Sequence, residues 1–192
     1  MSTDIDLKSF SDHRLGGHPV PKDLQLLLVH VKEVQKLTGI KVSDSAEWAP
    51  WLDVSYLSEA DLNNPEISAN IEAISAVCKY VSFVAATEDS EYIGYWRGPK
   101  IQNLSQSPIV RLDNEGQFNV CAGMNIVEAL LADIYNGSTF LKFKRLFESV
   151  GMELPYASYA EIPYKDDPVD ETYVRPAELH NELYGTFRNL KK

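Results

Sequence analysis

Residues 80–121, YVSFVAATEDSEYIGYWRGPKIQNLSQSPIVRLDNEGQFNVC, decide the fold class of this chain. Short runs rich in Val, Ile, Tyr, Phe and Trp alternate in this stretch with polar turns, as the strands of a sheet do. We predict strands over residues 80–86, 92–96, 108–112 and 117–121, with the last strand returning antiparallel to the third.

The connections between these strands carry their own signals. Residues 87–90 and 113–116 are polar, and Gly116 suits the end of a tight turn. Gly94 interrupts a strand pattern, which indicates a β-bulge or the close approach of a neighbouring backbone. The block is therefore predicted to be a set of short strands joined by turns.

Helix patterns lie before and after this block. We predict helices over residues 21–38, 64–78, 125–135, 138–150 and 176–187. In most of them apolar residues recur at spacings of three and four, which defines one buried face. Strands grouped in the middle of the chain, with helices on either side in the sequence, indicate the α+β class.

Three of these helices have marked starts. Asn64, followed by Pro65 at the first turn, is a preferred N-cap. Asn125 and Glu128 stand three apart before an apolar run, as in a capping box. Ser138 is expected to cap the next helix.

The charge of the chain limits its partners. The formal net charge is -10 over 192 residues, which argues against nucleic acid because phosphate binding needs clustered Lys and Arg. It permits a basic protein partner, which a negative field steers in; the alternative is that the acidity only keeps the protein soluble. Residues 44–91 hold ten acids and one base, Lys79, and so carry nearly all of the net charge.

The chain is expected to be one domain over residues 1–154, with 1–19 as an irregular lead-in. Residues 155–192 are rich in Pro and Tyr, and they form an extension that either wraps the domain or docks a partner. Cys78 and Cys121 are interpreted as reduced core residues. No signal peptide or apolar span is recognised, so we expect a cytoplasmic protein without membrane contact.

Motifs for catalysis are missing from the sequence. It contains no nucleophile elbow, no P-loop, no H-E-x-x-H and no C-x-x-C. His13 and His18 lie five apart, but no Cys, Asp or Glu pair accompanies them at coordinating spacing. We therefore assign no catalytic, cofactor-binding or metal-ligating residues and expect the protein not to be an enzyme.

Residues 80–135 resemble the SUKH superfamily, which contains bacterial immunity proteins and a yeast regulator of cell-wall synthesis. The similarity rests on an acidic turn before a Tyr-rich strand (Asp89–Trp96), a Pro-Val-like strand ending in an acidic turn (Pro108–Gly116), and a helix after the last strand (Asn125–Leu131). The chain lacks the Leu-Pro that the family often has near its first helix and the Asn-Gly-Gly that follows it. Residues 43–66 and the tail past 155 also depart from its pattern.

This resemblance implies an antiparallel, curved sheet of about four to six strands, with helices packed on one side and at the ends. It also implies binding rather than catalysis, because many relatives neutralise toxins that are often nucleases. A nuclease must be basic to hold its substrate, so a surface that mimics phosphate inhibits it. The expected state is a monomer or a weak homo-oligomer. The contact residues that we predict are Glu88, Asp89, Glu91, Tyr92, Trp96, Arg97, Trp48 and Trp51.

An alternative from another class stays open. The chain is then a small-molecule-binding or hydrolytic α+β domain, with a cleft between the sheet and the C-terminal tail. Its candidate residues are His180, Tyr92 and the carboxylates of the 88–91 turn. A convergent His and carboxylate pair in a pocket favours this alternative.

Overall fold

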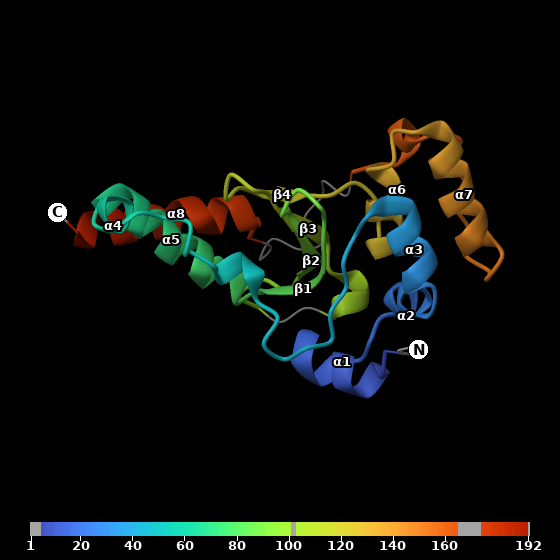
Figure 1. The fold of residues 1–192 in the computed structure, drawn as a ribbon, viewed down its shortest axis with the longest axis horizontal. Helices are drawn as coiled ribbons and strands as arrows, with labels where there is room; N and C mark the ends of the chain where they lie inside the picture. The colour runs from blue at the N-terminus through green and yellow to red at the C-terminus, as the bar shows by residue number, and fades with distance from the viewer. Residues whose placement is uncertain (1–4, 101–102, 165–173, 192) are drawn as a thin grey trace.

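The computed structural model describes residues 5–100, 103–164 and 174–191. Within these ranges it has an α+β fold in which one antiparallel sheet lies between two groups of helices (Figure 1). The sheet has the order β1-β2-β3-β4. Its strands are β1 (Val81–Ala86), β2 (Tyr92–Trp96), β3 (Ile109–Leu112) and β4 (Phe118–Val120). The predicted class and the four predicted strands are confirmed.

The helices of the described ranges are α1 (Leu7–Arg14), α2 (Lys22–Val29), α3 (Val31–Thr38), α4 (Glu59–Leu62), α5 (Pro65–Cys78), α6 (Ile126–Ala132), α7 (Gly137–Glu148) and α8 (Pro176–Leu190). Short 3-10 turns cover Pro50–Leu52, Leu104–Gln106 and Tyr159–Glu161. The helix predicted over 21–38 is two helices, because His30 leaves the helical region (φ -104°, ψ 20°). Its backbone N–H is shared between the carbonyls of Leu26 and Leu27.

Residues 1–19 are not irregular throughout, contrary to the sequence prediction. Asp6 accepts a hydrogen bond from the Ser9 backbone N–H at 2.9 Å and so caps α1. Phe10 in α1 and Leu15 just after it are fully buried. The helix is only two turns long, and it owes its place to these two apolar side chains packing into the core.

Asparagine caps three helices. Asn64 accepts from the backbone of Glu66, and Asn125 accepts from the backbone of Glu128, as the sequence predicts. The prediction of Ser138 as a cap is wrong. Asn136 is the N-cap of α7, because its Oδ1 accepts from the backbone N–H groups of Ser138 at 3.1 Å and Thr139 at 3.0 Å.

Gly94 marks a β-bulge, as its place inside a strand predicts. The pairing of β1 with β2 shifts by one residue between Phe83 and Ala85, opposite Gly94. A Cβ at Gly94 would lie 2.3 Å from the carbonyl oxygen of Ser82 and 2.6 Å from the Cα of Phe83. Only glycine fits between the two strands at this point.

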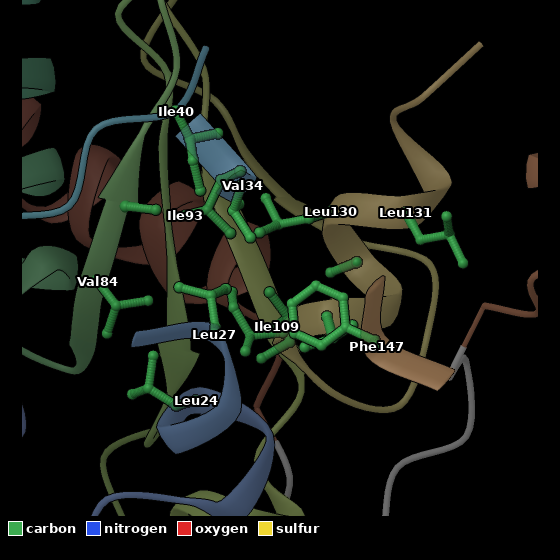
Figure 2. Close-up of a cluster of buried hydrophobic side chains, with 14 of the residues drawn as sticks. Leu24, Leu27, Val34, Ile40, Val84, Ile93, Ile109, Leu130, Leu131 and Phe147 are labelled. Atoms are coloured by element: carbon green, nitrogen blue, oxygen red, sulfur yellow. The ribbon is translucent and has the colours of Figure 1, made fainter. Parts of the chain in front are cut away.

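The larger part of the core lies on one face of the sheet, under α2, α3, α6 and α7. Figure 2 shows Val84, Ile93 and Ile109 of the sheet facing Leu27 of α2 and Leu130 of α6. A buried hydrogen-bond hub joins these elements. The carboxylate of Asp23 in α2 accepts from the Tyr95 hydroxyl at 2.8 Å and from the Ile126 backbone N–H at 2.9 Å.

A second apolar cluster covers the other face of the sheet. Its strand residues are Val81, Phe83, Trp96, Val110, Leu112 and Phe118. Its helix residues come from the end of α5 and from Leu179 and Leu183 of α8. Helices therefore cover both faces, whereas the family resemblance implies helices on one side and at the ends. The added layer comes from α8, which lies alongside α5 (Figure 1).

The described parts of the C-terminal extension pack on the rest of the chain. Tyr164 pairs with Ala122 in an antiparallel bridge, and Ile162 is buried in the larger core. The indole N–H of Trp96 donates to the carbonyl of Val174 at 2.9 Å. Residues 165–173 lie outside the described ranges.

Candidate functional site

The turn between β1 and β2 holds two of the predicted contact residues in the open. Glu88 and Asp89 are exposed. The turn is closed by the Thr87 backbone N–H, which donates to the Glu91 carbonyl at 2.9 Å, and Ser90 takes a left-handed conformation (φ 62°). Both carboxylates therefore project from a well-defined turn.

Glu91, the third acid predicted for this surface, forms an ion pair within the chain. Its carboxylate lies 3.2 Å from the Arg111 guanidinium, which also pairs with Asp133. Glu91 and Arg111 are each about three-quarters buried. Glu91 is thus part of an ion network between β2, β3 and the end of α6, and its charge is already compensated within the chain.

Three of the predicted aromatic residues meet at the edge of the second apolar cluster. The Trp51 ring lies 5.3 Å from Trp48, 4.5 Å from Phe83 and 5.7 Å from Tyr92, measured between ring centroids. The Arg14 guanidinium lies over both tryptophans, 5.2 Å from the Trp48 ring and 5.6 Å from the Trp51 ring. The structure thus brings Trp48, Trp51 and Tyr92 together from loop and strand.

Trp96 and Arg97 do not belong to this surface. Trp96 is 0% exposed, its indole N–H donates to the Val174 carbonyl, and it is not available to a partner. Arg97 is half-buried, and its guanidinium donates to the Lys79 carbonyl at 2.6 Å. Trp96 ends β2, about 13 Å along the strand from Tyr92 at its start, and Arg97 follows it.

A small pocket opens beside Trp51 and Tyr92. Its volume is about 260 Å³. Its lining residues are Pro50, Trp51, Asp53, Tyr56, Ile74, Ser90, Tyr92, Leu112, Asp113, Asn114 and Gly116. We call this the Trp51 pocket. Ser90 belongs to the Glu88–Asp89 turn, so the turn reaches the pocket, but Glu88 and Asp89 do not line it. The Glu88 carboxylate lies beside Gly39, at the end of α3.

Two residues of the Trp51 pocket were not among the predicted contacts. Asp53 is exposed, and its pKa is lowered by hydrogen bonds from the Ser55 backbone and side chain. Tyr56 is 79% exposed. Burial raises the pKa of the Tyr92 hydroxyl, and the neighbouring Asp53 and Tyr56 raise it further. The spacing Trp51-x-Asp53-x-x-Tyr56 was a usable signal, but only the fold shows that it faces Tyr92.

The charge of residues 44–91 is partly compensated by α8. Arg188 contacts Glu66 at 2.6 Å, and Lys191 contacts Glu72 at 2.7 Å. Within the described part of the chain, Glu88, Asp89 and Asp53 form no such ion pair. Uncompensated carboxylates therefore remain at the turn and in the Trp51 pocket. Among the described residues, Asp44, Glu47, Glu59 and Asp61 form no ion pair either.

A second cleft lies between the sheet and the C-terminal tail, as the alternative prediction requires. Its volume is about 400 Å³. Arg111, Asp133 and Cys121 line it on one side, and Tyr159 and Tyr164 line it on the other. Of the residues predicted for this alternative, Glu91 lines the cleft, whereas His180 and Tyr92 do not. His180 lies on α8, 5.9 Å from the Phe118 ring.

The chemistry available in this cleft is limited. Burial raises the pKa of the Cys121 thiol to about 11, although the nearby Arg111 lowers it. A thiol with that pKa stays protonated at neutral pH and is a poor nucleophile. No His lines the cleft. The cleft therefore offers hydrogen-bonding groups and aromatic rings rather than a nucleophile with its base.

Across the described ranges, no three His, Cys, Asp or Glu side chains converge as a metal site would require. In the same ranges no helix combines the length and the apolar character needed to cross a membrane. Comparisons with protein families, with curated proteins and with solved structures find no match for this chain.

Proposed function

We propose that this chain is a protein-binding module that captures a basic partner through the β1–β2 turn and the Trp51 pocket. One observation carries the proposal. Glu88 and Asp89 are exposed and form no ion pair within the described ranges, and their turn supplies Ser90 to the lining of a pocket with aromatic walls, at the end of the sheet where β2 begins. The charge of such a surface selects the class of protein that it binds, and buried aromatic side chains supply most of the affinity.

The surface fits a partner that itself binds phosphate. A nuclease presents Lys and Arg where its substrate docks, and carboxylates on a rigid turn occupy the same places as phosphates. In this proposal the chain acts like an immunity protein, inhibiting a toxin by covering its substrate site. The family resemblance of residues 80–135 supports the same function, and no catalytic step by this chain is involved.

The first experiment is co-expression of the chain with the protein encoded by the adjacent reading frame. We expect a complex that survives size-exclusion chromatography and protects cells from that protein. Reversing the charge of the turn with Glu88→Lys and Asp89→Lys should weaken the affinity of the complex by at least about tenfold, because the charge at the contact changes by four units.

A matched control reverses two carboxylates elsewhere. Glu148→Lys and Glu153→Lys change the net charge by the same amount at the end of α7, at the edge of the molecule (Figure 1). This control should keep the complex. Equal weakening by both double variants would mean that only the net charge matters, and the proposed contact surface would be wrong.

The cleft behind Arg111 favours a second candidate function, the binding of a small molecule. Its volume of about 400 Å³ lies within the range of about 300–1,000 Å³ that is usual for ligand sites. The mixture of Arg111, Asp133 and Tyr residues suits a ligand with several hydroxyl groups. Soaking crystals with a panel of monosaccharides tests this function, and density in the cleft for none of them would remove it.

A further inference from the structure

We propose that the Trp51 pocket holds one Lys or Arg side chain of the protein partner. This inference rests on the proposed function and names the group that the surface recognises. The pocket supplies three features that a buried cation needs: negative charge, aromatic walls and a size that admits a single side chain. Each feature can be traced to particular residues.

The negative charge comes from two carboxylates. Asp53 and Asp113 line the pocket, and none of the described residues that line it is Lys, Arg or His. Asp113 is fixed in place, because its Oδ1 accepts from the Gln117 backbone N–H at 2.8 Å and its Oδ2 accepts from the Asn119 amide at 3.1 Å. A cation in the pocket would therefore meet two acids without a competing internal base.

The aromatic walls are Trp51, Tyr92 and Tyr56. The planes of Trp51 and Tyr92 meet at 70°, with centroids 5.7 Å apart, so the rings form a corner rather than a stack. Phe83 holds both rings from behind, at 4.5 Å from Trp51 and 6.1 Å from Tyr92. Tyr56 is largely exposed at the rim. Aromatic rings arranged around a site are a known way to bind ammonium and guanidinium groups.

The chain already binds one cation with the same aromatic group. Arg14 lies over Trp51 at 5.6 Å and over Trp48 at 5.2 Å, both within the distance at which a ring attracts a cation. This contact is outside the pocket, since Arg14 does not line it. The tryptophan pair therefore already contacts one guanidinium outside the pocket, and Trp51 also lines the pocket itself.

The size of the pocket decides between a side chain and a larger ligand. Its volume of about 260 Å³ is below the range of about 300–1,000 Å³ that is usual for small-molecule sites. The turn that carries the exposed Glu88 and Asp89 reaches the pocket at Ser90 and places further negative charge beyond it, which suits a basic protein better than an isolated small cation. We therefore assign the pocket to a side chain that projects from a protein.

The test uses two probes that differ only in the cation. Nα-acetyl-lysine N-methylamide and Nα-acetyl-norleucine N-methylamide share a linear side chain, and only the first carries an ammonium group. Both are titrated into ¹⁵N-labelled full-length protein while amide and indole signals are followed. The lysine probe should shift signals of Trp51, Asp53, Tyr56 and Ser90, and it should bind at least about fivefold more tightly than the norleucine probe.

Substitutions at two exposed residues of the pocket test the contact without disturbing the fold. Asp53→Asn and Tyr56→Ala should each weaken binding of the lysine probe by about two- to fivefold. Glu153→Gln and Tyr164→Ala, which are also exposed and lie away from the pocket, should leave it unchanged.

Several results would overturn the assignment. Equal binding of the two probes, shifts confined to other regions, or unchanged binding by both pocket variants would each exclude a cation site here. Tighter binding of tetramethylammonium than of the lysine probe would point to a free small cation instead of a protein side chain. These outcomes are independent of the co-expression experiment. A partner complex that forms without any lysine binding would leave the proposed function standing and remove only this inference.

Discussion

At the scale of single residues, Gly94 is the position where the sequence most narrowly determines the structure. A Cβ there would lie 2.3 Å from a backbone oxygen of the neighbouring strand, which cannot move without breaking the pairing of β1 with β2. We predict that Gly94→Ala lowers the free energy of unfolding by more than about 3 kcal/mol, measured by urea denaturation.

The matched control for Gly94 is Gly137, the first residue of α7. A Cβ at Gly137 meets no atom within 4 Å. Gly137→Ala should leave stability unchanged or raise it by up to about 1 kcal/mol, because Ala favours the helix. Similar stabilities for the two variants would contradict the bulge at Gly94.

His180 gives a prediction about pH at the same scale. Burial against Phe118 lowers its pKa below the ordinary value of 6.5. The folded state therefore binds this proton less readily than the unfolded state. The stability that His180 contributes is present above about pH 6.5 and is lost as the pH falls through that value. The slope of unfolding free energy against pH between 7 and 5 should be smaller in His180→Phe, and an unchanged slope would refute the assignment.

At the scale of elements, helix starts are predictable where the capping residue and its targets are close in sequence. Asn64 and Asn125 were recognised for that reason. Asn136 and Gly137 follow the helix predicted over 125–135. Because Asn-Gly is common after a helix and Ser138 is also a preferred cap, the sequence favours Ser138 as the start of the next helix. Asn136 and Gly137 follow α6 and also begin α7. The local sequence does not distinguish the end of one helix from the start of the next.

The cap of α7 is therefore open to a direct test. Asn136→Ala removes the acceptor for two backbone N–H groups and should lower the free energy of unfolding by about 1 kcal/mol. Ser138→Ala removes only an exposed hydroxyl and should cost less than about 0.5 kcal/mol. The reverse order of the two losses would restore Ser138 as the cap.

At the scale of the whole molecule, long-range packing separates what the sequence predicts from what it does not. The α+β class follows from the pattern of residues 80–121. Trp96 packs in the second apolar cluster with Leu179 and Leu183 of α8, and its indole N–H bonds to Val174, which lies 78 residues later in the chain. Glu66 pairs with Arg188, 122 residues away. Partners this distant leave no local signal, so the sequence predicts Trp96 on the surface and shows the charge of residues 44–91 without these ion pairs.

In the candidate site, too, the local sequence predicts some features and long-range packing decides others. Trp48, Trp51 and Tyr92 were chosen from the sequence because aromatic and acidic residues are dense there, and the fold brings them together. Asp53 and Tyr56 belong to the site because their loop lies beside Tyr92 at the start of β2, which the local sequence does not show. The sequence therefore indicates the composition of the surface, whereas packing decides which of its residues meet.

The most direct test of the central claim is the affinity of this chain for the protein encoded beside it, measured by isothermal titration calorimetry at low and high salt. We predict binding that weakens with salt and falls at least about tenfold when Glu88 and Asp89 are both changed to Lys. The Glu148→Lys and Glu153→Lys control should bind as the wild type does. Binding that is absent, or equally strong after reversal of the Glu88–Asp89 turn, would contradict the account.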